Sequence, residues 1–78
     1  MEIIINAYFY KDMKTLKRLR KQYREALSIL LEKGFCEYKK EFPLDKCQDF
    51  DIARIDLKTK IKACNEYISL LRIVRGNW

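Results

Sequence analysis

The 78-residue sequence contains no histidine, two glycines and a single proline. Without histidine, the chain lacks the commonest general base in enzymes and a common zinc ligand. With two glycines, it cannot form the glycine-rich loops that bind phosphate groups. So few turn-forming residues also argue against a sheet of many short strands. These absences predict a small, mostly helical protein that is not an enzyme and binds no cofactor.

Cysteine is also sparse, with Cys36, Cys47 and Cys64 far apart and no CxxC pair. A secreted disulfide scaffold normally has an even and denser set of cysteines. A zinc site made of thiolates would need a fourth ligand. We therefore expect reduced, buried thiols and no metal, with a bridge between Cys36 and Cys47 as the open alternative.

Long hydrophobic runs are missing as well. The apolar run at residues 3–5 follows an acidic residue and ends at Asn6, which is unlike a signal peptide. No stretch approaches the roughly 20 apolar residues that a membrane-spanning helix needs. We therefore expect no membrane span and a cytoplasmic, intracellular protein.

What the chain does contain is a balance of 49% hydrophobic and 36% charged residues, which is too apolar for disorder. Its length predicts a single domain over residues 1–78. A chain this short buries only about 60% of its unfolded surface, so a lone core would be marginal. A partner subunit is therefore expected.

A first amphipathic helix is predicted over residues 7–33. Its apolar residues recur at helical spacing, interrupted by Arg20, and they are Phe9, Met13, Leu16, Tyr23, Leu27 and Leu30. Gly34 is the residue type that commonly ends a helix. The start stays open between a cap at Asn6 and an extended chain up to Asp12.

A second helix is predicted over residues 46–75, where Arg54 again interrupts the apolar pattern. The apolar positions are Cys47, Phe50, Leu57, Ile61, Cys64, Ile68 and Leu71. Asp45 and Gln48 resemble a capping box at its start, and Gly76 would end it. Asp56 on this helix is a candidate partner for the arginine of the first helix.

The connection over residues 34–45 is long for a structureless loop. Phe35, Tyr38 and Phe42 share one helical face, which predicts a short third helix before Pro43. The alternative is a strand that pairs with residues 3–10 and gives a β-α-β-α arrangement.

The two long helices have nearly equal lengths, which favours antiparallel packing as a helical hairpin. We place Lys33 beside Lys46 to set the register. Both helices carry broad apolar stripes, and two helices alone offer too little interior to bury them. The expected fold is therefore an all-α hairpin that dimerises into a four-helix bundle.

The net charge is +6, and it is unevenly distributed, because residues 35–56 alone carry a net −2. Five cations fall on one face of the first helix at helical spacing: Lys14, Lys17, Arg18, Lys21 and Arg24. Such a face keeps a helix solvated, attracts an acidic partner or contacts phosphates without reading base sequence.

An apolar cluster near the two chain ends predicts a binding interface. Its members are Ile3, Ile5, Tyr8, Phe9, Tyr10 and Trp78. The pattern is too general to indicate a family. We therefore expect a small regulatory protein that binds itself and another protein as a homodimer. The alternative is a basic dimer that binds nucleic acid weakly and largely independently of sequence.

Overall fold

The computed structural model describes residues 2–76, with side chains through Ile73, and these residues form four helices. The helices are α1 (Glu2–Phe9), α2 (Met13–Lys33), α3 (Phe35–Glu41) and α4 (Phe50–Gly76). The all-α prediction is confirmed. The β-α-β-α alternative is wrong, because no strand occurs within residues 2–76.

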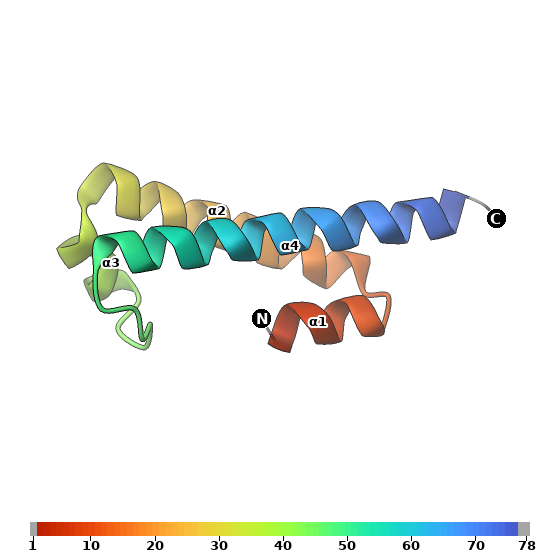
Figure 1. Cartoon of the computed structure of the whole chain (residues 1–78), viewed down its shortest axis with the longest axis horizontal. Helices are drawn as coiled ribbons and strands as arrows, with labels where there is room; N and C mark the ends of the chain where they lie inside the picture. Colours follow the sequence, from red (N-terminus) through yellow and green to blue (C-terminus); the bar gives the residue numbers. More distant parts are fainter. Residues whose placement is uncertain (1, 77–78) are drawn as a thin grey trace.

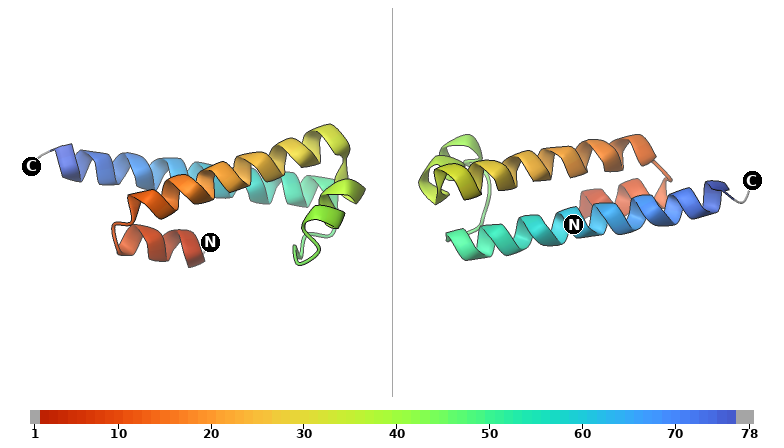
Figure 2. Two further views of the ribbon diagram at one scale, coloured as in Figure 1. Left: turned by 180° about the vertical axis from the view of Figure 1, so that it is seen from behind. Right: turned by 90° about the horizontal axis from the view of Figure 1, so that it is seen from above.

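The two long helices, α2 and α4, lie side by side and run in opposite directions (Figure 1). The short helices α1 and α3 both lie on one side of this pair, near its two ends (Figures 1 and 2). The molecule is elongated as a result, with extents of 47 × 20 × 17 Å.

The core is divided into two clusters along the α2–α4 pair. The first cluster brings α1 against the pair and contains Ile4, Ala7, Met13, Leu16, Leu19, Ala63, Cys64, Ile68 and Leu71. The second brings α3 against the pair and contains Ala26, Leu30, Tyr38, Ala53 and Leu57. Each short helix therefore covers one apolar cluster that the two long helices cannot bury by themselves.

The first helix was predicted over residues 7–33, with its start open between a cap at Asn6 and an extended chain up to Asp12. The structure begins α2 at Met13, after Asp12, and places residues 2–9 in a separate helix, α1, where an extended chain was the alternative. Lys11 has a φ of 55°, in the left-handed region, and the chain reverses there. Asp12 then caps α2, because its carboxylate accepts hydrogen bonds from the backbone N–H (3.0 Å) and hydroxyl (2.5 Å) of Thr15. These two bonds lower the pKa of Asp12. The reversal lets Ile4 and Ala7 bury against α2 and α4, which a continuous helix would prevent.

At the other end of α2, Gly34 has a φ of 87°, and its N–H bonds to the carbonyl of Leu30 at 3.0 Å. This left-handed conformation suits glycine and separates α2 from α3. The connection contains a helix, as one of the two sequence alternatives predicted.

The second long helix begins at Phe50, four residues later than predicted. The side chain of Asp49 accepts a hydrogen bond from the N–H of Ile52 at 2.9 Å and so caps α4. Asp45, the predicted cap, is engaged elsewhere, as described below.

The contacts between α2 and α4 also differ from the predicted register, by between one and two helical turns. The guanidinium of Arg20 donates to the side-chain oxygen of Asn65 at 3.0 Å. The ammonium of Lys60 lies 5.5 Å from the centre of the Tyr23 ring. Asp56, which the sequence suggested as the partner of Arg20, binds Lys60 instead.

All three cysteines are free thiols, but only Cys64 is buried. The prediction that all three are buried is wrong for Cys36, which is exposed at the start of α3. Within residues 2–76, no helix is both long enough and apolar enough to cross a bilayer.

Candidate functional site

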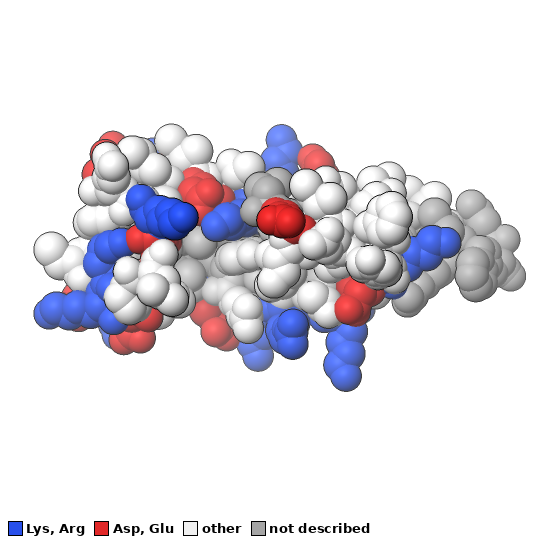
Figure 3. All heavy atoms as spheres, turned by 90° about the horizontal axis from the view of Figure 1, so that it is seen from below, with Lys and Arg blue, Asp and Glu red and all other residues white. Residues whose placement is uncertain are grey.

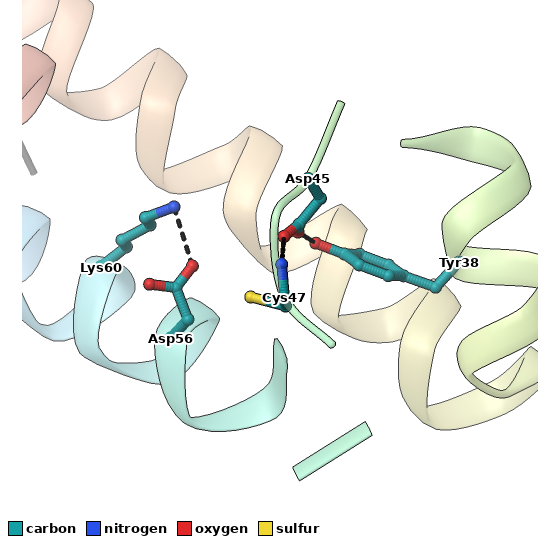
Figure 4. Close-up of polar contacts among 5 residues, drawn as sticks. All are labelled: Tyr38, Asp45, Cys47, Asp56 and Lys60. Atoms are coloured by element: carbon teal, nitrogen blue, oxygen red, sulfur yellow. Dashed lines mark hydrogen bonds and ion pairs between the residues drawn. The ribbon is translucent and has the colours of Figure 1, made fainter. Parts of the chain in front are cut away.

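An open groove of about 990 Å³ lies beside α3, between the chain segment 41–47 and the surfaces of α2 and α4. Large apolar side chains form much of its lining: Ile29, Phe42, Pro43, Leu44, Ile52 and Leu57. Ionisable groups from α3, α4 and the 41–47 segment converge at the same place (Figure 4). No pattern in the sequence predicted this groove.

Asp45 is the centre of the polar contacts at the groove. Its carboxylate accepts one hydrogen bond from the hydroxyl of Tyr38 and another from the backbone N–H of Cys47, the latter at 2.8 Å. The ammonium of Lys39 donates to the backbone carbonyl of Asp45. These contacts fix the 42–49 connection against α3, and Figure 4 shows the side chains of Tyr38 and Asp45 pointing toward one another.

The pKa values of these groups are shifted in directions that preserve the contacts. Burial, reinforced by the hydrogen bond to Asp45, raises the pKa of the Tyr38 hydroxyl above its ordinary value of 10.0. Burial raises the pKa of Cys47 to about 11, and the neighbouring Asp45 carboxylate adds to the effect. Burial works to raise the pKa of Asp45, but the hydrogen bonds from Tyr38 and Cys47 outweigh it and lower that pKa.

A second polar pair lies on α4 at the same groove. The ammonium of Lys60 is 2.8 Å from the carboxylate of Asp56 and also faces the Tyr23 ring. Burial works to lower the pKa of Lys60, but the hydrogen bond and charge of Asp56 outweigh it and raise that pKa. The Lys60 side chain is therefore protonated and held in place by the Asp56 carboxylate.

The chemistry of the groove suits binding. Near neutral pH the Cys47 thiol is protonated and so is a poor nucleophile, since the thiolate is the reactive form. The Asp45 and Asp56 carboxylates are already engaged by donors from the chain itself. Among the described residues, no three cysteine or acidic side chains converge as ligands of a metal ion would.

We predict that the contact between Tyr38 and Asp45 makes stability depend on pH at both extremes. Because the folded pKa of Tyr38 is raised, its contribution is complete below the unfolded value near 10 and is lost as the pH rises through the folded pKa. Because the folded pKa of Asp45 is lowered, its contribution is present above the unfolded value near 3.8 and is lost as the pH falls through the folded pKa.

The measurement is urea unfolding of the wild type and of Tyr38→Phe over a range of pH. Near neutral pH the variant is expected to be less stable by about 1.5–3 kcal/mol, as for other hydrogen bonds to charged groups. The difference between the two proteins should shrink below about pH 4 and above about pH 10. A difference that stays constant over the whole range would contradict the role given to this hydrogen bond.

The five predicted cations lie on the exposed surface of α2. Lys14, Lys17, Arg18, Lys21 and Arg24 are all exposed, and within residues 2–76 none of them forms an ion pair. In Figure 3, Lys and Arg side chains project from the lower edge of the molecule and also lie at its left end and upper edge. We call these five residues the basic face.

The predicted N-terminal interface residues do not all lie together. Tyr8 is half-buried, and its ring stacks on that of Tyr67 with 4.5 Å between centroids. Ile3 and Ile5 are exposed, but helical spacing places them on opposite sides of α1. The other exposed members are Phe9 and Tyr10, whose rings meet edge to face at 5.3 Å. Trp78 lies outside the described residues.

The stacked pair of Tyr8 and Tyr67 is flanked by exposed apolar side chains from both helices. Ile5 lies one turn before Tyr8 on α1, and Leu70 lies one turn after Tyr67 on α4. We call the following group the end patch: Ile5 (49% exposed), Phe9 (74%), Leu70 (45%) and Ile73 (62%). Leu70 and Ile73 were not among the predicted interface residues, because they lie outside the apolar stripe of α4 that packs on α2.

No family model, curated protein or solved structure matches this chain. Its function is therefore inferred from the chemistry of its own surfaces.

Proposed function

We propose that this chain is a small, non-catalytic regulatory protein that forms a homodimer and acts by binding another protein. The observation that carries the proposal is the end patch, where two helices present large apolar side chains around a half-buried tyrosine pair. Exposed groups of large apolar side chains often mark sites where another protein binds.

The energetics favour covering the patch. Burying one large apolar side chain fully contributes about 1.5–3 kcal/mol. A two-fold dimer would place the end patch of each subunit against its copy, because such an interface uses the same surface twice. The arrangement we propose is a bundle in which the α2–α4 hairpins of two subunits pack together through this end.

Two further features support a binding role over catalysis. Cys47 and Tyr38 have raised pKa values, so both are protonated near neutral pH. The Asp56 carboxylate is paired with Lys60. A general base or nucleophile would need to be free and to have a pKa near the working pH.

The test combines size-exclusion chromatography with light scattering on the full chain at micromolar concentration, followed by capture of partners from the native host. We expect a dimer or larger species that dissociates when Phe9 is changed to serine, and a protein captured from the host. A monomer of 9.5 kDa that captures no protein would overturn the proposal.

Binding to nucleic acid is the second candidate function, and the basic face favours it. Five exposed cations without ion pairs on one helix are suited to contacting phosphate groups. The face contains no asparagine or glutamine among its five members, so it would read little base sequence. A dimer would supply two such faces.

We predict that a short DNA or RNA duplex binds only weakly near physiological salt, with a dissociation constant of about 10⁻⁴–10⁻⁶ M. The charge reversals Lys14→Glu, Lys17→Glu and Lys21→Glu together should abolish this binding without changing helicity, because all three side chains are exposed. The control reverses three exposed lysines elsewhere, namely Lys46, Lys58 and Lys62.

The measurement is a gel-shift titration at several salt concentrations. If two faces neutralise about six to ten phosphates, affinity should fall by about three to five decades between low and physiological salt. Submicromolar binding near physiological salt that only the basic-face variant loses would favour nucleic-acid binding over protein binding.

A further inference from the structure

The groove beside α3 has a negative rim on a chain whose net charge is positive. Four carboxylates line it, from Glu25, Glu41, Asp45 and Asp56, against the two ammonium groups of Lys46 and Lys60. Lys60 is neutralised by Asp56, and Asp45 is held by donors from the chain.

Two of these carboxylates, on Glu25 and Glu41, are exposed and form no ion pair within residues 2–76. They come from different helices, since Glu25 is on α2 and Glu41 is the last residue of α3. The rim therefore presents two free anionic groups around one groove.

The groove surface between these carboxylates is apolar and open. Leu44 is 92% exposed and Ile52 is 47% exposed, although both are large apolar side chains. Phe42 and Ile29 beside them are half-buried. The segment that presents Leu44 is held against α3 by the contacts of Tyr38 with Asp45, so the surface is already formed without a ligand.

We propose that this groove binds a short amphipathic segment of another protein, one that inserts a large apolar side chain between Leu44 and Ile52. Lysine or arginine residues beside that side chain would pair with Glu25 and Glu41. The inference rests on the proposed protein-binding function and identifies the chemistry of the partner. The end patch and the groove are separate surfaces, since they share no residue.

The chain's own basic face does not meet this description. Between Tyr10 and Leu31, none of the exposed residues of α2 is a large hydrophobic one. A second copy that docked through its basic face would therefore pair with the carboxylates but leave the apolar surface uncovered. Nucleic acid is disfavoured as well, because phosphates are repelled by the free carboxylates at the rim.

The probes are three synthetic helical peptides of equal length. The first has one leucine-rich face flanked by arginines, the second replaces the arginines with glutamates, and the third replaces the leucines with alanines. Each is titrated into the isotope-labelled full chain, and backbone amide shifts are followed by NMR. We expect the arginine–leucine peptide to bind at least tenfold more tightly than either of the others, with shifts at groove residues.

Variants of the protein separate the charge from the apolar surface. Glu25→Gln combined with Glu41→Gln is expected to weaken the arginine–leucine peptide about three- to tenfold, as for two partly exposed ion pairs. Leu44→Ser should weaken it without changing its preference for arginine over glutamate. Glu66→Gln is the matched control, because Glu66 is an exposed carboxylate on α4 outside the groove.

The inference is overturned if no peptide binds, if the arginine and glutamate peptides bind equally, or if the shifts map to the end patch. A variant of the end patch, Phe9→Ser, keeps this test distinct from that of the proposed function. Peptide binding should survive Phe9→Ser, and peptide binding by a wild-type chain that is monomeric would support the groove while contradicting the dimer. A chain that dimerises but binds none of the peptides would support the dimer while contradicting the groove.

Discussion

Replacement of Tyr38 by alanine is expected to lower the free energy of unfolding by about 3–5 kcal/mol, the range for removing a buried aromatic side chain. Tyr38 is 2% exposed and is the central contact between α3 and the long helices. Its ring also packs against Phe42 at 5.0 Å and Phe35 at 6.3 Å. A domain of this size has a total stability of only about 5–15 kcal/mol, so the variant should be close to unfolding at room temperature.

The measurement is urea unfolding followed by circular dichroism. The matched control is Tyr10→Ala, because Tyr10 is an aromatic residue that is 76% exposed, and its replacement should change stability by no more than about 0.5 kcal/mol. The conservative variant Tyr38→Phe keeps the ring and isolates the loss of the hydrogen bond. Equal effects of the alanine changes at Tyr38 and Tyr10 would contradict the packing of α3 described above.

Replacement of Leu70 by aspartate is expected to raise the dissociation constant of the proposed homodimer by about 100-fold or more. In that dimer a carboxylate in the end patch would be buried without a partner, and each 1.4 kcal/mol of that cost weakens association tenfold. Leu70 is exposed in the single chain, so the change should leave helicity and the unfolding of the monomer nearly unchanged.

The dissociation constant is obtained by sedimentation equilibrium over a range of concentrations. Leu31→Asp is the matched control, because Leu31 is an exposed leucine on α2 outside the end patch. If Leu31→Asp dissociates the dimer and Leu70→Asp does not, the interface lies on another surface. The end patch would then lose its place in the proposed function.

The helical character of the chain could be predicted because it depends on local spacing. Apolar residues three and four apart define the buried faces of α2 and α4, whatever those helices pack against. The left-handed residue at Gly34 follows from composition in the same way. The exposure of the basic face follows too, since Lys14, Lys17 and Lys21 lie opposite the apolar stripe on one helix.

The reversal before α2 could not be predicted, because both outcomes are locally acceptable. Residues 7–12 can continue a helix, or they can end it at Lys11 and begin a new one at the Asp12 cap. The choice depends on whether Ile4 and Ala7 gain more from burial against α4 than the broken turn costs. The free energy gained by burying Ile4 and Ala7 is available only when α4 already lies beside α2.

Sequence alone therefore determined the two long helical segments of this protein and the cations that share one face of α2, and it favoured the all-α class. The tertiary structure decided where Asp45 makes its contacts, and with them the groove. An aspartate at this position can cap a helix or accept a hydrogen bond from Tyr38. Packing of Tyr38 against Ala53 and Leu57 brings its hydroxyl to Asp45. Asp49 therefore caps α4 in place of Asp45, and the helix begins at Phe50. Contacts between residues far apart in the chain make this choice, and local spacing carries no information about them.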